Sequence, residues 1–453
     1  MERFVVDRLR ERLLDRVVTA TDVDYDVIRA TFNATVQRRP AVIVRARTDD
    51  DVIAAVVAAA DLGLPIAVRG GGHGVAGHAM AEGALVVDLR DRRDVTVDPV
   101  SRTIRAAGGA LWDDVDTAAW KHHLAVVGGT FGDTGVAGLT LGGGIGWLSG
   151  LQGFTCDNLV RAEVITAAGE KVVAGPDGDP DLLWALRGGG GNFGVVTSFE
   201  FRAIDPGPIL AGYITYPASA VKQVLRHLAE LAAEAPDALE LTVAIGPHGA
   251  DPDAEITVRV GVAWPGQAST EPDALRRLRT ALPVIDDGLS LMEYPDLQAM
   301  SGRLPFGLRH YWKGHFLRGL DESVIGAVVE SMAARPHAIS MILMEAIRGA
   351  AHTEPEGGAA FGQRAAAWNA SALAIWDDAA TDPEHLAWAR ESADRLSVGT
   401  LSGAGYANYA PVDESIERVR LAFGNERFAR LASIKARYDP ENRFRFNLNV
   451  APG

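Results

Sequence analysis

Glycine is concentrated in three short runs of this chain. The sequence has 49 glycines in 453 residues, and they crowd into residues 69–77, 128–150 and 188–194. Glycine has no Cβ atom, so its backbone can adopt left-handed conformations and approach a ligand closely. Such runs are typical of sites lined by main-chain atoms. The sequence therefore predicts a protein that binds a ligand largely through its backbone.

Composition and charge exclude several classes of protein. Hydrophobic residues make up 47% and charged residues 23%, as in ordinary globular proteins, and the length suggests two or three domain-sized units. The formal net charge of -15 argues against a nucleic-acid partner, which needs a basic face. Cys156 is the only cysteine, so an intrachain disulfide and a cysteine-rich metal site are excluded.

The chain shows no targeting signal and no stretch of membrane-spanning length. Its first residues lack a basic segment followed by an apolar core, and charges interrupt every apolar run. Spanning helices need about 20 mostly apolar residues. We therefore expect a cytoplasmic protein that is not inserted in a membrane.

The first 205 residues alternate predicted strands with helices. Thr48 is expected to cap a helix that ends at Gly63. A region rich in glycine, 126–150, is predicted to lack regular structure, and Pro206 with Pro208 marks the expected domain boundary. The other predicted strands are 41–44, 66–69, 85–88, 95–97, 103–106, 162–166 and 195–201, and the other predicted helices are 111–123 and 181–186.

The middle of the chain has a different pattern, in which strands at 211–216, 239–245, 256–264 and 340–347 are separated by amphipathic helices. Ser219 is the expected N-cap of one helix. The apolar stripe of that helix is Val221, Val224, Leu225, Leu228 and Leu231. Two further helices are expected near 414–421 and 426–437. This pattern predicts an α+β domain with a broad sheet.

A single histidine lies inside the first glycine run. In the segment 68–74, Val-Arg-Gly-Gly-Gly-His-Gly, nothing bulky flanks His73. A neutral imidazole nitrogen there could approach a planar ligand and act as a nucleophile or a hydrogen-bond partner. On residue types alone, a buried structural histidine remains an alternative.

The same segment, with Gly77 and His78, resembles the flavin-attachment loop of the berberine-bridge-enzyme-like oxidases, which belong to the vanillyl-alcohol-oxidase or PCMH type of FAD proteins. Further family-like segments follow in order along most of the chain: 128–130, 135–146, 156–159, 184–197, 406–409 and 438–444. The resemblance implies that His73 bears the flavin through its 8α carbon. A G-x-G-x-x-G match at 189–194 precedes a predicted strand instead of a helix, so NAD is disfavoured.

The resemblance also implies the residues of the site. Tyr406 is expected to be the catalytic base, with Tyr409 as second choice. The residues expected to bind FAD are Arg69, Gly70, Gly71, Gly72, His73, Gly74, Gly77, His78, Gly129, Thr130, Gly135, Gly138, Leu139, Gly142, Gly143, Gly144, Gly146, Asp157, Asn158, Val195, Asn408, Asn447 and Asn449. Those expected to line the substrate side are Tyr311, Trp312, Lys313, Met341, Glu345 and Trp376.

The chain departs from the family members that attach the flavin twice. Those members carry a second, cysteinyl bond just before the segment 135–138, where this chain has Phe131 and Gly132. Cys156 lies well beyond that point and is expected to be a small packed side chain. The resemblance therefore implies one covalent bond, as in the bacterial nicotine-oxidase-like members. No metal motif is present.

The fold implied by the resemblance is an α+β, two-domain PCMH-type FAD-binding fold. The FAD domain would comprise residues 1–205 and 406–453, and residues 206–405 would form a substrate domain of antiparallel sheet covered by helices. The implied reaction removes a hydride from an alcohol or amine carbon of a small, secondary-metabolite-like molecule and passes the electrons to O2, giving H2O2. Alternatives are a carbohydrate oxidase, a flavoprotein catalysing a cyclisation or isomerisation, and a binding module for another phosphorylated ligand. A monomer or a homodimer is expected.

Overall fold

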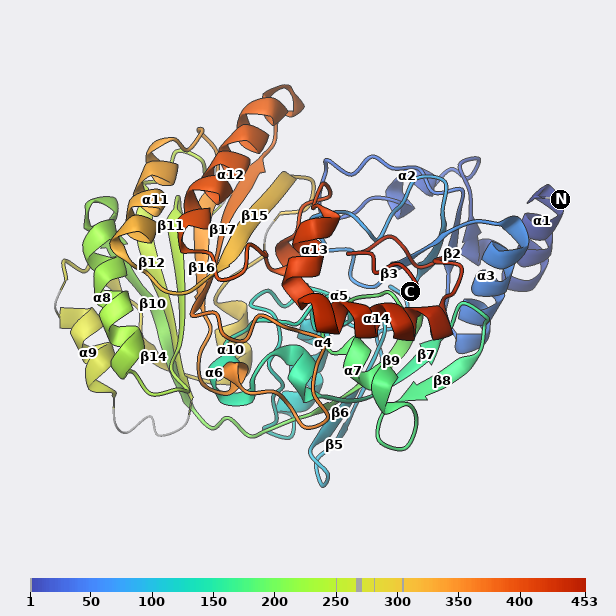
Figure 1. Cartoon of the computed structure of the whole chain (residues 1–453), viewed down its shortest axis with the longest axis horizontal. Helices are drawn as coiled ribbons and strands as arrows, with labels where there is room; N and C mark the ends of the chain where they lie inside the picture. Colours follow the sequence, from blue (N-terminus) through green and yellow to red (C-terminus); the bar gives the residue numbers. More distant parts are fainter. Residues whose placement is uncertain (1, 250, 266–270, 281, 304) are drawn as a thin grey trace.

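The N-terminal part of the chain forms a four-stranded sheet. The computed structural model describes residues 2–249, 251–265, 271–280, 282–303 and 305–453, and its strands form three sheets (Figure 1). The first has the order β1-β2-β4-β3, with β2, β4 and β3 parallel. Its strands are β1 (Val17–Val18), β2 (Val42–Arg45), β3 (Ile66–Arg69) and β4 (Leu85–Asp88).

The helix α3 (Asp49–Leu62) makes the crossover between β2 and β3, which places the glycine-rich run at the end of β3. The Thr48 side chain accepts a hydrogen bond from the Asp51 amide, and Gly63 ends the helix in the left-handed conformation with φ 64°. Both predicted caps are thus confirmed. Helix α1 (Glu2–Leu13) packs against α3, and α2 (Tyr25–Ile28) lies in the connection to β2.

The second sheet has five antiparallel strands in the order β5-β6-β9-β7-β8. Helices α4 (Trp112–Trp120) and α7 (Pro180–Leu186) pack on its strands. The strands are β5 (Val95–Asp98), β6 (Thr103–Ala107), β7 (Leu159–Ile165), β8 (Lys171–Ala174) and β9 (Val195–Arg202).

The prediction that 126–150 lacks regular structure was wrong in part. A short helix, α5 (Val136–Leu141), follows Gly135, and α6 (Ser149–Gln152) begins at the end of the region. Val136 is fully buried, and Leu139 packs against the same apolar cluster. The apolar residues between the glycines therefore supply a buried helical face that a count of glycines does not reveal.

The third sheet is the largest and contains eight strands. Its order is β13-β10-β12-β11-β16-β17-β15, and β14 also pairs with β10. The sequence analysis did not predict β15 or β17. Because β17 is buried along its whole length, its residues do not alternate between apolar and polar. The strands are β10 (Ile209–Pro217), β11 (Glu240–Gly246), β12 (Thr257–Pro265), β13 (Asp286–Asp287), β14 (Ser290–Met292), β15 (Arg309–Leu317), β16 (Met341–Ala346) and β17 (Trp368–Trp376).

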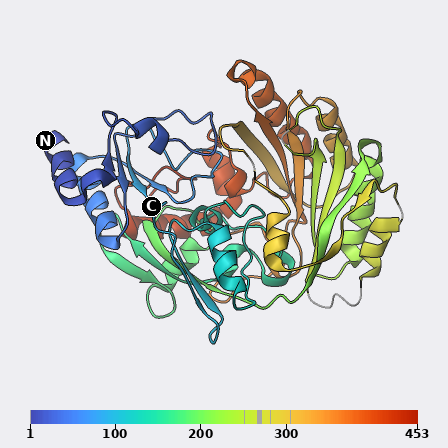
Figure 2. The same cartoon turned by 180° about the vertical axis from the view of Figure 1, so that it is seen from behind.

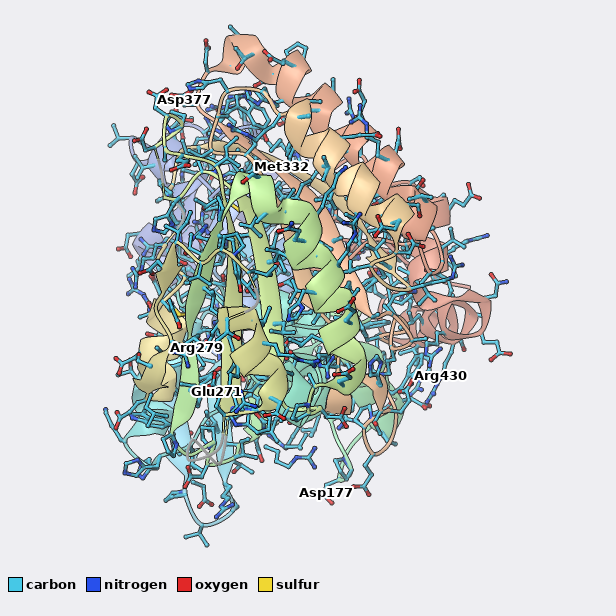
Figure 3. All side chains as sticks on the ribbon, turned by 90° about the vertical axis from the view of Figure 1, so that its left-hand side faces the viewer. Asp177, Glu271, Arg279, Met332, Asp377 and Arg430 are labelled. Atoms are coloured by element: carbon cyan, nitrogen blue, oxygen red, sulfur yellow. The ribbon has the colours of Figure 1, made fainter. Side chains whose placement is uncertain are left out.

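Helices cover one face of this sheet. They are α8 (Val221–Glu234), α9 (Asp273–Thr280), α11 (Glu322–Ala333) and α12 (Asp382–Leu396). Figure 3 views this layer from outside, with Arg279 marking α9 and Met332 marking α11. The predicted stripe of α8 is buried against the sheet. Ser219 is not its N-cap, because a 3-10 turn (Ala218–Ala220) precedes the helix and no side chain caps it.

The opposite face of the large sheet is turned toward the first half of the chain. Leu241, Val243 and Ile245 of β11 belong to the core under the helices, so Thr242 and Ala244 point the other way. The short helix α10 (Tyr294–Ala299) contacts both α4 and β10. A surface of the sheet thus remains for a site between the two halves.

The C-terminal segment returns to the first half of the chain (Figure 2). Helices α13 (Ile416–Phe423) and α14 (Asn425–Tyr438) pack there through Val419, Phe423 and Leu431. The fully buried Lys435 ammonium donates to the backbone oxygens of Asn192 and Phe444 and pairs with Asp439 at 2.6 Å. These bonds fix the last residues beside the glycine runs.

Candidate active site

One large cavity, of about 470 Å3, lies between the two halves of the molecule. This volume is in the range of ligand pockets. Its walls come from the glycine runs, from the C-terminal segment and from the inner face of the large sheet. Among the predicted residues, those that line it are Gly70, Gly71, Gly72, His73, Gly74, His78, Gly129, Thr130, Gly135, Gly138, Leu139, Gly142, Trp312, Met341, Glu345, Tyr406, Asn408, Tyr409 and Asn447.

Two glycines on the cavity wall permit a close backbone crossing. A Cβ atom on Gly71 would lie 2.6 Å from the Cα and backbone nitrogen of Gly135. Both contacts are with backbone, so no side-chain movement relieves them. The crossing brings the loop after β3 against the start of α5, and both present main-chain atoms to the cavity.

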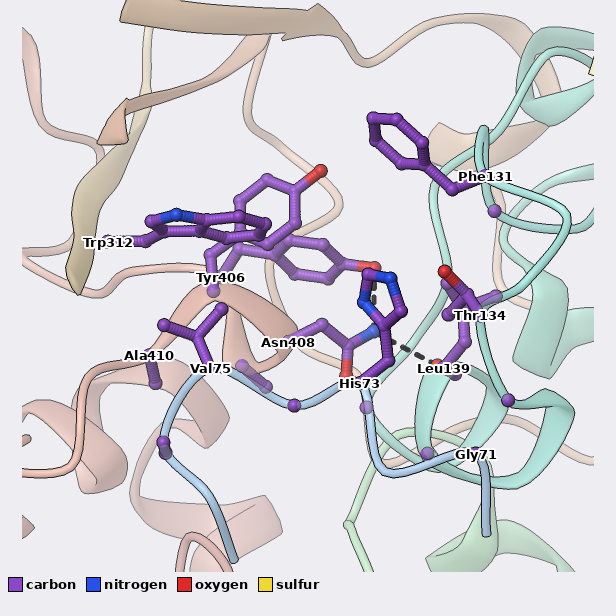
Figure 4. Close-up of a pocket in the computed structure, with 18 of the residues that line it drawn as sticks. Gly71, His73, Val75, Phe131, Thr134, Leu139, Trp312, Tyr406, Asn408 and Ala410 are labelled. Atoms are coloured by element: carbon purple, nitrogen blue, oxygen red, sulfur yellow. Dashed lines mark hydrogen bonds between the residues drawn. The ribbon is translucent and has the colours of Figure 1, made fainter. Parts of the chain in front are cut away.

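His73 projects into this cavity (Figure 4). Its ring stacks on Phe32 with centroids 4.0 Å apart, and Phe32 stacks in turn on His310 at 4.3 Å. Its Nε2 lies 3.7 Å from Oδ1 of Asp133, which is too long for a hydrogen bond, and both atoms are buried without a hydrogen-bond partner among the described residues. Burial lowers the pKa of His73, and Asp133 acts in the opposite direction. The imidazole is therefore neutral at pH 7 and has its plane fixed.

Further buried polar atoms are available to a ligand around the cavity. Nε2 of His78 and Oδ1 of Asn447 both have no hydrogen-bond partner among the described residues. Burial lowers the pKa of His78 to about 4, with a further effect from Arg38, so this imidazole is neutral too. A buried polar atom without a partner is costly, and a bound polar ligand would remove that cost.

The Tyr406 hydroxyl is held from three sides. The amides of Gly144 and Ile145 donate to it at 3.0 and 3.1 Å, and Asn408 Nδ2 donates at 2.8 Å. Asn408 also donates to the Leu139 oxygen. Burial raises the pKa of Tyr406 above its ordinary range. Tyr406 thus ties the C-terminal segment to the loop 142–145, and among the described side chains no carboxylate accepts its proton.

Tyr409 and Glu345 form a second polar pair in the same cavity. The Tyr409 hydroxyl donates to Oε1 of Glu345 at 3.0 Å, and Asn369 Nδ2 donates to the other carboxylate oxygen at 2.7 Å. Burial raises the pKa of Glu345 to about 7, although both hydrogen bonds oppose the shift. A carboxyl that titrates near neutrality beside a phenol can accept a proton through that phenol.

Apolar side chains form a slot on the inner face of the sheet. The Trp312 ring packs edge-on against Tyr409 with centroids 5.2 Å apart. The other apolar residues of the slot are Ile339, Met341, Leu343, Leu373 and Ile375. This part of the cavity wall offers a ligand apolar packing surface instead of hydrogen-bond partners.

Comparisons with known proteins identify the family. Residues 40–175 match the family model described as FAD binding domain, and residues 405–451 match the one described as Berberine and berberine like. The chain is 32% identical to (R)-6-hydroxynicotine oxidase of Paenarthrobacter nicotinovorans, over 96% of each chain. The chain belongs to the berberine-bridge-enzyme-like FAD-linked oxidoreductases.

Solved structures agree with this assignment of the fold. The crystal structure of 6-hydroxy-D-nicotine oxidase from Arthrobacter nicotinovorans aligns with a TM-score of 0.89 at 30% identity and covers 97% of this chain and 98% of that one. Xylooligosaccharide oxidase from Myceliophthora thermophila has the same fold, with a TM-score of 0.87 at 23% identity and 99% coverage of both chains. The predicted PCMH-type α+β fold is thereby confirmed.

Several residues expected at the site of this FAD-linked oxidoreductase lie elsewhere. Arg69 turns away and donates to the Ile28 oxygen, while Asp157 forms a buried ion pair with Arg364 at 2.5 Å. Asn158 donates to the backbone oxygens of Gln152 and Phe154. The remaining expected FAD residues that do not line the cavity are Gly77, Gly143, Gly144, Gly146, Val195 and Asn449.

Three expected substrate residues also face away from the cavity. Tyr311 donates to Asp413, and Trp376 donates to Asp382. Both belong to the core under the helices. Lys313 does not line the cavity either. The reason is strand parity, because Tyr311 and Lys313 alternate with the inward-facing Trp312 on β15.

The sequence analysis missed other residues of the cavity wall. Gly188, Gly189, Gly190 and Gly191 line it, although only their segment had been noticed. The partners of His73, namely Phe32 and Asp133, carried no local signal. Tyr213 and Arg259 were also missed, because their approach depends on the pairing of strands in the large sheet.

No helix in the described parts of the chain is both long and apolar enough to cross a membrane.

Proposed function

We propose that this protein is an FAD-dependent oxidase that carries its flavin through one covalent bond, from His73 to the 8α carbon. The glycine-walled cavity with a neutral, stacked imidazole inside it is the observation that supports this most strongly. Phe131 and Gly132 stand where a second, cysteinyl link would arise. Cys156 is buried within an apolar cluster and does not line the cavity.

The glycine runs would hold the cofactor mainly through main-chain amides. Consecutive backbone N–H groups can neutralise a pyrophosphate without a lysine. The unpaired atoms of His78 and Asn447 offer polar contacts to the same ligand. The proposed division into an FAD domain of residues 1–205 and 406–453 and a substrate domain of residues 206–405 fits this arrangement.

The reaction we propose is oxidation of a carbon bearing a hydroxyl or an amine. The chemistry that FAD supplies when bound is acceptance of a hydride and transfer of two electrons to dioxygen, which gives hydrogen peroxide. Tyr409 would take the proton of the substrate hydroxyl or amine while its own proton passes to Glu345 across the 3.0 Å hydrogen bond. Tyr406 would act as a positioning residue because three donors already engage its oxygen.

The apolar slot favours a small aromatic or otherwise planar substrate. Trp312, Met341 and Leu343 would pack on its faces and exclude water from the reacting carbon. A carbohydrate oxidase is less favoured, because the side chains that form this slot are apolar and would leave sugar hydroxyls without hydrogen-bond partners.

The proposal is tested by purifying the protein and adding a panel of aromatic alcohols and amines under air. A yellow protein whose visible absorbance bleaches without oxygen, and which produces peroxide with oxygen, is the expected result. A colourless preparation would contradict the proposal, as would a yellow protein that converts a substrate without taking up oxygen.

A further inference from the structure

Arg259 is a cation in the cavity wall without a carboxylate partner. It lies on β12 opposite Ala244 of β11 and Thr215 of β10. Its neighbours Val258 and Val260 are buried under the helices, so Arg259 points to the inner face, where it lines the cavity. Its guanidinium carbon lies 5.5 Å from the centre of the Tyr213 ring.

No carboxylate of a side chain that the structure describes lies within 4.0 Å of the guanidinium. Its Nε is buried without a hydrogen-bond partner. Arg303, which lines the same cavity, is by contrast paired with Asp113. Arg259 is thus the unpaired cation of the two.

The surroundings of Arg259 show that the charge is partly desolvated. Burial lowers its pKa, although a guanidinium stays protonated in proteins. Its charge also lowers the pKa of His248, which lines the same cavity, so His248 does not compete for an anion as a second cation but can donate a hydrogen bond. A partly buried charge without a counter-ion is destabilising, and an anionic ligand would offset that cost.

The register of the sheet sets the distance between Arg259 and Glu345. Glu345 pairs with Thr242, and Thr242 pairs with Gly261. Arg259 lies two residues from Gly261 on the same face of β12. The Cα atoms of Arg259 and Glu345 are therefore two strand spacings apart across the sheet and one two-residue step apart along it, which gives a distance of roughly 12 Å. The span accommodates one or two aromatic rings.

We infer that Arg259 binds a carboxylate of the substrate, at the end remote from the carbon that is oxidised. This inference rests on the proposed function, since it assigns the substrate class of the same cavity: a planar aromatic acid bearing an oxidisable alcohol or amine. The carboxylate lies against the guanidinium, the ring packs on Ala244 and Leu343, which follow Arg259 in the same row across the sheet, and the reacting group meets Tyr409. A bidentate contact with the guanidinium fixes the orientation of the substrate.

The test is a titration of the purified yellow protein with benzoate, 1-naphthoate and indole-3-carboxylate, and with the primary amide of each. Binding is followed by the change in the visible flavin spectrum. At least one carboxylate should bind about tenfold or more tightly than its amide. Arg259→Met should abolish that preference by raising the Kd of the carboxylate, and Arg259→Lys should restore part of it. Arg303→Met, which removes a cation already paired with Asp113, should keep the preference.

Equal binding of acids and amides, or no spectral response to any of the three acids, would overturn the inference, as would a preference that survives in Arg259→Met. A changed flavin spectrum or lost flavin in ligand-free Arg259→Met would also overturn it, because the cation would then act on the cofactor. Because acid and amide are compared in the unaltered protein, this part of the test does not depend on the folding of any variant. A colourless preparation would instead contradict the proposed function itself.

Discussion

Replacing Glu345 by glutamine should increase stability and strongly reduce activity. Burial raises the pKa of Glu345 from 4.5 to about 7, so the folded protein binds this proton more tightly than the unfolded chain. Its favourable contribution is complete below about pH 4.5 and is lost as the pH rises through 7. The loss amounts to about 3 kcal/mol at pH 8. Glutamine does not ionise, and its amide can donate to Tyr409 while its oxygen accepts from Asn369.

Activity should change in the opposite direction. Without a carboxylate to take the proton from Tyr409, kcat should fall about a hundredfold or more. The kcat of the unaltered protein should rise with pH through about 7, and the remaining activity of Glu345→Gln should lack this rise. The stability effect is measured as the decrease in Tm between pH 5 and pH 8, which should be smaller in the variant.

Glu240 provides a matched control. It is buried on the neighbouring strand β11, its pKa is raised to about 8 by burial, and it does not line the cavity. Glu240→Gln should therefore also reduce the loss of Tm at high pH, but kcat and its pH profile should not change. The reasoning would be refuted by a Glu345→Gln protein that keeps its activity, or by one whose Tm still falls with pH as in the unaltered protein.

Two further predictions concern side chains around the proposed flavin site. Asp133→Asn should lower the fraction of protein with covalent flavin by about tenfold, because Nε2 of His73 loses the carboxylate beside it. Mass spectrometry measures that fraction, and Asp113→Asn is the control. An unchanged fraction in Asp133→Asn would exclude a role for Asp133. Tyr406→Phe should lower the free energy of unfolding by about 1–3 kcal/mol, since the amides of Gly144 and Ile145 lose their acceptor. It should also reduce kcat less than Tyr409→Phe does. If Tyr406→Phe instead has the lower kcat of the two, Tyr406 is the base.

Local signals in the sequence predicted much of the first half of the chain. The capping residues Thr48 and Gly63 act within a few residues of the helix they bound, so their effect can be read without the fold. The position of His73 between glycines was visible for the same reason. The α8 stripe was also predicted, because the period of a helix is carried by consecutive residues.

Features that depend on strand pairing could not be predicted. Glu345 and Tyr409 are 64 residues apart and meet because the turn Ala407–Tyr409 of the C-terminal segment contacts the large sheet at β15. Strand β15 carries aromatic residues on both faces, and only its register with β17 decides that Trp312 faces the cavity and Tyr311 does not. Phe32 reaches His73 through the packing of a loop, which no periodicity encodes.

The covalent bond at His73 is the central claim, and peptide mass spectrometry after proteolysis of acid-precipitated protein tests it most directly. The account predicts that the peptide containing His73 carries the mass of the flavin and that His73→Ala releases all yellow colour on precipitation. A washed, denatured protein whose His73 peptide has its unmodified mass would contradict the account.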